Sequence, residues 1–132
     1  MPVVDITPAV AEQRQLIQRY GDGGFRIAGL DYIGSVLIEP EQTHPWPIVD
    51  PAAVSIESLA PITRSGRTQP IGGMVMLLGT GAEPAIIHRD LRVKLRALGI
   101  GLEVMGTGAA CRTFNVLLAE DRAVVAALLA VP

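Results

Sequence analysis

The second half of the chain alternates continuous apolar runs with stretches in which apolar residues recur at helical spacing. Residues 71–78 form a continuous apolar run, which is typical of a strand buried on both faces of a sheet. Residues 102–105 and 124–129 predict two further strands. Spacings of three and four residues predict two helices between them, with the apolar faces Ile87, Leu91, Leu95, Leu98 and Ala110, Phe114, Leu117, Leu118.

Both predicted helices have recognisable ends. Pro84 stands where the first helix can begin, and Gly99 can end it. Thr107 can cap the second helix, which we expect to end near Asp121. Strand, helix, strand, helix and strand in this order predict an α/β fold whose sheet is largely parallel.

The first half of the chain predicts a β-hairpin. The glycine-rich turn at 21–24 precedes an alternating run at 25–28, and a β-rich run at 32–38 follows and ends at Pro40. Residues 10–20 are compatible with a short helix or with an extended segment.

Proline dominates residues 39–53, which contain four of the ten prolines and the single tryptophan. Proline has no N–H donor, so we expect an ordered loop rather than a strand of the sheet, with Trp46 as its packed anchor. Residues 54–64 predict a short helix with Ser55 as a possible cap. Its apolar side holds Ile56, Leu59 and Ile62.

The expected fold class is α/β: a three-layer single domain over residues 1–132, with a central mixed, largely parallel sheet, helices on its faces and an N-terminal β-hairpin. Hydrophobic residues make up 49% of the chain and charged residues 18%, which excludes a disordered protein. The longest apolar run, 123–131, has nine residues, against the roughly 20 that a membrane-spanning helix needs. We therefore expect a soluble domain without a membrane span.

The charge balance argues against nucleic acid as a partner. Eleven basic and thirteen acidic residues give a net charge of −2, whereas a nucleic-acid binder is expected to carry a basic excess or a basic stripe. Four cations do cluster on the first predicted helix: Arg89, Arg92, Lys94 and Arg96. They form either a solvated helix face or a docking patch for an acidic partner.

Cys111 is the single cysteine, so the chain can form neither an internal disulfide nor a thiolate zinc cluster of its own. A reducing compartment follows from this. The N-terminal residues show neither a secretory nor a mitochondrial leader pattern. We expect a cytoplasmic protein.

Two motifs carry a resemblance to a known family. They are Leu-Gly-Thr-Gly at 78–81 and Thr-Gly-Ala-Ala-Cys-Arg-Thr-Phe-Asn-Val-Leu at 107–117, supported by segments 21–25 and 32–40. The chain resembles, from about residue 18 to 130, the domain-of-unknown-function family that contains mitochondrial complex I assembly factor 3 and small bacterial and archaeal relatives. The resemblance implies a three-layer α/β domain, a protein partner and no established enzyme class. Gly106 departs from the family, whose members commonly carry a polar or acidic residue there.

The candidate binding site lies at two strand-to-helix junctions, 79–81 and 106–108. Helix N-termini expose unpaired N–H groups and a partial positive charge, and both junctions would lie at the carboxyl ends of neighbouring parallel strands. We therefore expect two helix N-termini at one crevice, which could bind a small anion or the carboxylate of a partner, with Arg112 adding a full charge. The candidate residues are Gly79, Thr80, Gly81, Thr107, Gly108 and Arg112. The alternative is that the glycines only allow tight turning.

Catalytic chemistry has weaker support. Cys111, in the first turn of a helix and beside Arg112, is a conceivable nucleophile, but a buried, inert cysteine is the better interpretation. His44 and His88 sit in separate segments, and the acidic residues show no paired spacing. We expect no catalytic residues, no metal site and no cofactor.

Two hypotheses of function remain. The first is a non-catalytic protein-binding or assembly-factor-like module. The second is a small enzyme or anionic-ligand binder that uses the crevice at Thr80 and Thr107 with Arg112. An enzyme should show a cleft with converging ionisable groups, whereas a binding module should show an exposed apolar patch or an arginine cluster.

Overall fold

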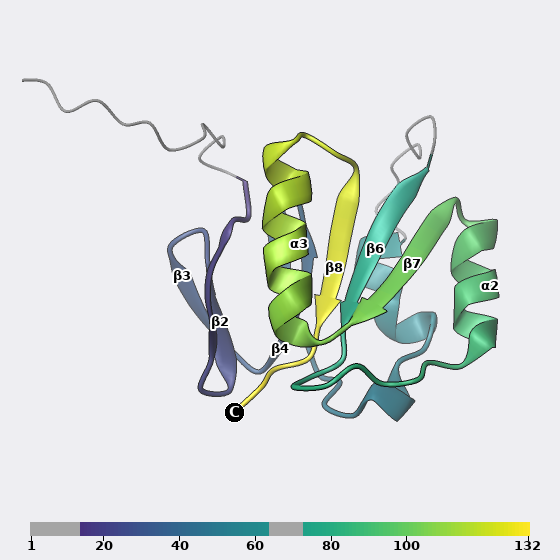
Figure 1. The fold of residues 1–132 in the computed structure, drawn as a ribbon, viewed down its shortest axis with the longest axis horizontal. Helices are drawn as coiled ribbons and strands as arrows, with labels where there is room; N and C mark the ends of the chain where they lie inside the picture. Colours follow the sequence, from purple (N-terminus) through teal and green to yellow (C-terminus); the bar gives the residue numbers. More distant parts are fainter. Residues whose placement is uncertain (1–13, 64–72) are drawn as a thin grey trace, which may run out of the picture.

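The computed structural model describes residues 14–63 and 73–132, which form a five-stranded mixed sheet, a three-stranded antiparallel sheet and the helices around them (Figure 1). The strands are β1 Ile17–Gly21, β2 Gly24–Ile27, β3 Leu30–Ile33, β4 Ser35–Glu39, β5 Gln42–Trp46, β6 Met74–Gly79, β7 Ile100–Met105 and β8 Val124–Leu128. The helices are α1 Ala60–Thr63, α2 Arg89–Ala97 and α3 Thr107–Ala119, with two 3-10 turns, η1 Pro51–Ala53 and η2 Glu57–Leu59. The predicted α/β class, with its mixed sheet and N-terminal hairpin, is confirmed.

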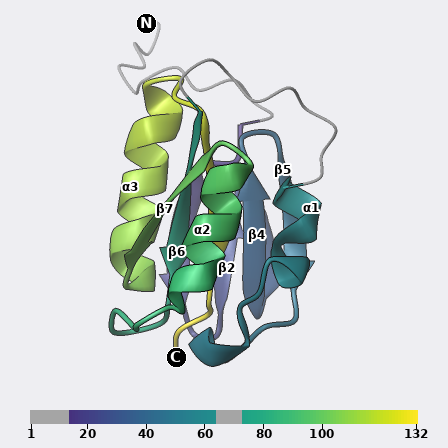
Figure 2. The same cartoon turned by 90° about the vertical axis from the view of Figure 1, so that its right-hand side faces the viewer.

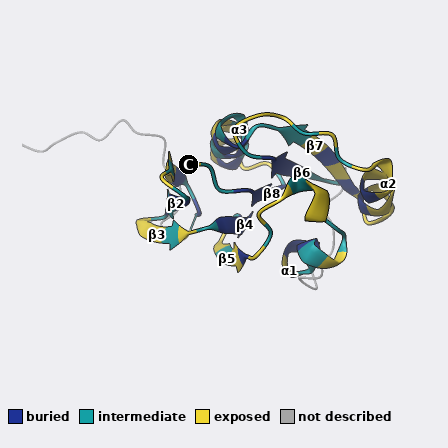
Figure 3. Cartoon of the chain, turned by 90° about the horizontal axis from the view of Figure 1, so that it is seen from below, coloured by how far each residue is buried: buried dark blue, intermediate teal, exposed yellow. Residues whose placement is uncertain are grey.

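Strand β8 is the centre of the five-stranded sheet, whose order is β5-β4-β8-β6-β7. It pairs antiparallel with β4 and parallel with β6, and β6 pairs parallel with β7. All five residues of β8 are buried, and successive side chains point to opposite faces of the sheet. The sheet therefore separates two hydrophobic cores, and Figure 3 shows β8 and β4 in dark blue between α3 and α1.

Helix α3 covers one face of this sheet. Its residues Ala110, Phe114 and Leu118 pack in one core with alternate residues of β4, β6 and β8. The three-stranded sheet closes the same core from the side with Ile17, Phe25 and Ile27. Helix α3 thus lies between two sheets, as Figure 1 shows.

The other face of the five-stranded sheet is covered by α2, η2 and α1 (Figure 2). Leu91 and Leu95 of α2 are buried there together with Leu59 and Ile62, as the apolar spacing predicts. Trp46 belongs to the same core, and its indole N–H donates to the carbonyl oxygen of Ser58 at 3.0 Å. Trp46 is therefore the anchor that the sequence indicates.

The prediction that residues 39–53 form only a loop is wrong. Residues Gln42–Trp46 form β5, which pairs antiparallel with β4 and places Pro45 opposite Val36. Strand β5 is an edge of the sheet, and an edge strand needs N–H donors on one side only. A proline can therefore be accommodated there.

Helix α2 is shorter than its apolar pattern suggests. It begins at Arg89 rather than near Pro84, after the ring nitrogen Nδ1 of His88 accepts a hydrogen bond from the backbone N–H of Asp90 at 3.2 Å. Ile87 is only partly buried and Leu98 is 43% exposed, so the predicted apolar face is not fully buried at either end. Gly99 ends the helix with a φ of 79°, as expected.

The N-terminal hairpin differs from its prediction in one respect. Strands β2 and β3 form the expected antiparallel hairpin, but the run at 32–38 divides at Gly34, whose φ is 87°. Strand β3 stays in the small sheet, whereas β4 enters the large one. Of the ambiguous segment 10–20, residues 17–20 belong to strand β1. Residues 1–13 and 64–72, which include the start of that segment and the ends of two other predicted elements, lie outside the described part.

Phe114 gives a direct test of the core around α3. Its side chain is fully buried, while Leu117, also expected in the core, is only partly buried. Phe114→Ala should lower the free energy of unfolding by about 3–5 kcal/mol, because it leaves a cavity between two sheets. Leu117→Ala, as a matched control, should cost clearly less. A loss below about 1 kcal/mol for Phe114→Ala in chemical denaturation would contradict this packing.

Candidate functional site

The two glycine junctions meet at one end of the five-stranded sheet. Gly79 at the end of β6 lies opposite Met105 at the end of β7, as expected for parallel neighbours. The backbone N–H of Gly81 donates to the hydroxyl oxygen of Thr107 at 2.9 Å, and the N–H of Thr107 donates to the Gly81 carbonyl at 2.8 Å. The structure therefore brings the two junctions together.

Thr107 does not cap α3 with its side chain. Gly106 is the N-cap residue, and no side chain makes a capping hydrogen bond there. The Thr107 hydroxyl is fully buried and donates to the carbonyl oxygen of Leu129 at 2.7 Å, besides accepting from Gly81. The hydroxyl therefore joins the chain after β6 and the chain after β8 to the start of α3. Both hydrogen bonds are made to backbone groups within the protein.

Thr80 is used in the same way. Its hydroxyl donates to the carbonyl oxygen of Glu83 at 2.9 Å and accepts from the N–H of Ala85 at 3.0 Å. The residue is 5% exposed. Thr80 therefore shapes the loop after β6, and its side chain is turned away from solvent.

Gly79 is required by close packing. A Cβ atom at this position would lie 2.9 Å from the Cα of Thr107, a distance too short for any larger residue without movement of the backbone. Of the six candidate residues, Gly79, Thr80 and Thr107 thus build the junction.

The expectation of two helix N-termini at this edge is wrong. Helix α2 begins at Arg89, so a non-helical segment follows β6 in place of a helix. Helix α3 is the element whose N-terminus lies at the junction, since its first residue is Thr107. The local dipole and the free N–H groups therefore come from one helix.

A crevice of about 500 Å³ opens beside the start of α3. We use "the crevice" for this hollow, whose lining includes Tyr20, Gly81, Pro84, Gly108, Ala109 and Arg112. Gly81, Gly108 and Arg112 are the predicted site residues that it contains. Arg112 is exposed, as its position opposite the buried face of α3 predicts.

Tyr20 lines the crevice but was not among the residues that the sequence predicted for this site. Its hydroxyl accepts a hydrogen bond from Nη1 of Arg112 at 3.3 Å, across 92 positions of the sequence. A Cβ atom on Gly108 would lie 2.5 Å from the Tyr20 hydroxyl oxygen, so the phenol rests directly against the start of α3. No local pattern in the sequence connects β1 with α3.

Asn115 explains how Tyr20 reaches this position. Its side-chain amide donates to the carbonyl oxygen of Ile17 at 2.8 Å, and its oxygen accepts from the N–H of Ile17 at 2.9 Å. An amide side chain of α3 thereby satisfies the backbone of β1 as a neighbouring strand would. This paired contact fixes β1 beside α3.

Cys111 has the properties of a structural thiol. It is 3% exposed and packs in the core under α3. Burial raises its pKa from 9.0 to about 12, which outweighs the lowering by the charge of Arg112 and by a backbone hydrogen bond. The thiolate needed for nucleophilic attack is therefore disfavoured at neutral pH.

The remaining candidates lie apart from the crevice. The cations of α2 are all exposed, and the guanidinium of Arg92 donates to the carbonyl oxygen of Leu102 on β7. His44 pairs with the buried Glu39 at 2.9 Å on the β4–β5 hairpin. Among residues 14–63 and 73–132, no group of three or more His, Cys, Asp or Glu side chains could hold a metal ion. No helix in that part of the chain is long and apolar enough to cross a membrane.

Comparison with known proteins identifies a family and several relatives that this chain resembles. A family model described as a protein of unknown function, DUF498/DUF598, matches residues 17–129. An uncharacterized protein of Rhodobacter capsulatus is 41% identical over 88% of this chain and 85% of its own length. The NADH dehydrogenase [ubiquinone] 1 alpha subcomplex assembly factor 3 of Danio rerio is 32% identical over 98% of this chain and 72% of its own. A Bartonella henselae crystal structure, described as an outer membrane protein, is 39% identical with a TM-score of 0.80, over 92% of this chain and 98% of that one.

The burial of Cys111 predicts slow thiol chemistry. A neutral alkylating reagent at pH 7 should modify the folded protein at least about tenfold more slowly than the unfolded chain, since both burial and the raised pKa oppose reaction. Mass spectrometry over time measures the rate. Cys111→Ala should also leave partner binding intact. Rapid modification of the folded protein would contradict the structural role and restore the candidate nucleophile.

Proposed function

The chain belongs to the DUF498/DUF598 family of proteins of unknown function, and we propose that it acts as an assembly-factor-like, protein-binding module. The observation that carries this proposal is the similarity to an assembly factor of NADH dehydrogenase over 98% of the chain. A similarity of that extent includes the whole scaffold around α3.

The crevice is the proposed contact point for a partner. It presents the exposed guanidinium of Arg112, the phenol of Tyr20 and the start of α3, where no side chain caps the helix. Such groups suit a carboxylate on a partner protein, because helix N-termini and arginine both favour negative charge. Gly81 and Gly108 contribute backbone to this surface without side chains that would fill it.

The enzymatic alternative gains no support from the crevice. Its conceivable nucleophile, Cys111, is buried with a raised pKa. The hydroxyls of Thr80 and Thr107 are bound to backbone groups.

We further propose a cytoplasmic location, which the free thiol of Cys111 supports.

An affinity pull-down from the native host with the full chain tests the binding role. Arg112→Gln removes the charge from the crevice while keeping a polar side chain, and should reduce recovery of a specific partner at least about fivefold, the effect of one lost charge-assisted contact. Arg96→Gln, on the exposed face of α2, is the matched control and should retain the partner. Failure of the wild-type chain to recover any reproducible partner would contradict the proposed function.

A further inference from the structure

The strand register of the three-stranded sheet defines an inner and an outer face. Tyr20, Phe25 and Tyr32 form one cross-strand row, and Phe25 is buried in the core under α3, so this row lies on the inner face. Successive residues of a strand point to opposite sides of the sheet. The two neighbouring rows therefore lie on the outer face, away from α3. These rows are Arg19, Arg26, Asp31 and Gly21, Gly24, Ile33.

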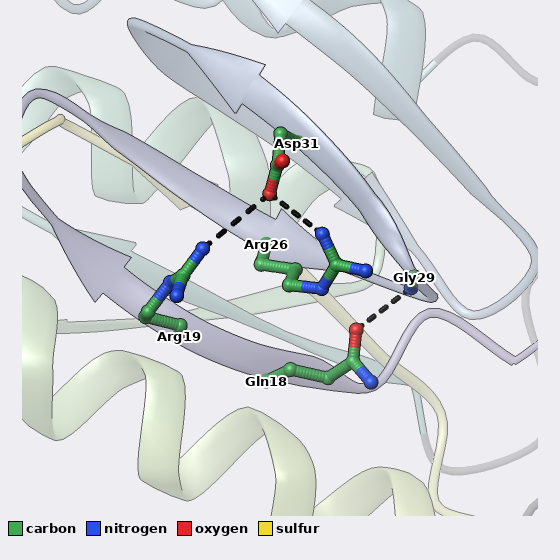
Figure 4. A network of polar contacts seen from close by, with 5 residues as sticks. All are labelled: Gln18, Arg19, Arg26, Gly29 and Asp31. Carbon is green, nitrogen blue, oxygen red and sulfur yellow. Dashed lines mark hydrogen bonds and ion pairs between the residues drawn. The ribbon is translucent and has the colours of Figure 1, made fainter.

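The first outer row is charged and divided by sign. Oδ1 of Asp31 lies 3.7 Å from Nη2 of Arg19 and 3.0 Å from Nη1 of Arg26, and Figure 4 shows the three side chains together on one side of the sheet. The amide oxygen of Gln18 accepts from the backbone N–H of Gly29 at 2.7 Å and joins β1 to the turn between β2 and β3. Strands β1 and β2 thus carry the cations of this row, and β3 carries the anion.

The second outer row is divided by size. Ile33 on β3 is 99% exposed, whereas β1 and β2 carry glycines at the matching positions. A Cβ atom on Gly24 would lie 2.1 Å from the carbonyl oxygen of Tyr32, so a side chain cannot be added there without movement of the backbone. We use "the outer hollow" for the space of about 300 Å³ on this face, whose lining includes every residue of the two outer rows.

The outer face is therefore complementary to itself. A two-fold axis parallel to the strands, between β2 and β3, would place β3 of each copy over β1 and β2 of the other. Ile33 would then enter the outer hollow of the other copy, and Asp31 would lie over Arg19 and Arg26. One axis serves both rows, because rotation about it leaves each position along the strands unchanged. Symmetric dimers need such a self-complementary surface.

The charge of the outer face does not oppose this pairing. The lining of the outer hollow includes two arginines and two aspartates, Asp22 and Asp31, which sum to zero, whereas the complete chain has a net charge of −2. Like-charge repulsion across an interface, which would disfavour association, is thus balanced here. Each copy contributes one face of three strands of four or five residues. Such a contact is smaller than the roughly 1,200–2,000 Å² that stable complexes bury, so the dimer should be weak.

We propose that this chain forms a two-fold dimer through the outer face of its three-stranded sheet, with Ile33 of each copy in the outer hollow of the other. This inference is independent of the proposed function. The crevice is lined by Tyr20, whose side chain belongs to the inner face. The dimer therefore leaves the crevice open and carries two of them.

Sedimentation equilibrium of the full chain, from about 10 μM to about 1 mM, measures this association. The wild-type chain should show a concentration-dependent equilibrium of monomer and dimer. Ile33→Glu should weaken the dimer at least about tenfold, because it replaces a buried apolar side chain by a charge. Ile86→Glu is the matched control: Ile86 is 100% exposed on the loop before α2, the change in charge is the same, and the association should be unchanged.

A charge exchange tests the pairing of the charged rows. Asp31→Arg gives a row of three arginines, and the double substitution Arg19→Asp, Arg26→Asp gives a row of three aspartates. Each of these two variants alone should dimerise at least about tenfold more weakly than the wild-type chain, since like charges would face each other. An equimolar mixture of the two should form a heterodimer at least as tight as the wild-type dimer. Far-UV circular dichroism checks that each variant is folded.

A measurement on the wild-type chain needs no substitution. Isotope-filtered NMR on an equimolar mixture of labelled and unlabelled chains detects contacts between copies. Methyl protons of Ile33 in one copy should show contacts with the Hα protons of Gly24 in the other.

Three results would overturn the inference. They are a wild-type chain that stays monomeric at about 1 mM, equal weakening by Ile33→Glu and Ile86→Glu, and a dimer without contacts between copies at Ile33. Loss of the pull-down partner on Ile33→Glu, in a chain that is monomeric, would assign the outer face to another protein. If the chain is monomeric while the pull-down still depends on Arg112, this inference fails and the protein-binding role stands. If the dimer forms and no partner is recovered, the protein-binding role fails and this inference stands.

Discussion

The arrangement of this domain depends on one buried hydroxyl, that of Thr107. It links the chain beyond β6, the chain beyond β8 and the first turn of α3 through hydrogen bonds to Gly81 and Leu129. A buried backbone N–H or carbonyl without a partner costs about 1–3 kcal/mol. Separating any of these three segments would break one of the hydrogen bonds, so their relative positions are fixed. Gly79 completes the constraint, since the start of α3 lies where a side chain on this residue would be.

This constraint determines which polar side chains are exposed at the crevice. The threonines, the most obvious polar side chains of the two junctions, are turned inward and bound to backbone groups. The polar side chains at the surface come from elsewhere: Arg112 from the outer face of α3 and Tyr20 from β1. Asn115 joins these two elements by pairing with both backbone groups of Ile17. The proposed binding surface therefore depends on how the three-stranded sheet packs against α3.

The sequence predicted the parts of this fold that depend on periodicity. Continuous apolar runs located β6 and β8, and helical spacing located the buried face of α3. Features that depend on tertiary contact were not predictable. Pro45 is accommodated because β5 is an edge, the start of α2 is set by His88, and Tyr20 meets Arg112 only after the sheets pack. The sequence predicted that the two glycine junctions are neighbours. Whether the hydroxyls of Thr80 and Thr107 face a ligand or the backbone depends on their burial, which no local sequence pattern indicates.

The most direct test is hydrogen exchange of the Gly81 amide, with the free energy of unfolding, in Thr107→Ser and Thr107→Val. Serine keeps the hydroxyl, whereas valine keeps the shape and leaves the Gly81 N–H and the Leu129 carbonyl without this partner. Thr107→Val should lower the free energy of unfolding by at least about 2 kcal/mol more than Thr107→Ser, and the Gly81 amide should lose its protection in the valine variant alone. Equal stability of the two variants, with the Gly81 amide protected in both, would contradict this role of the Thr107 hydroxyl.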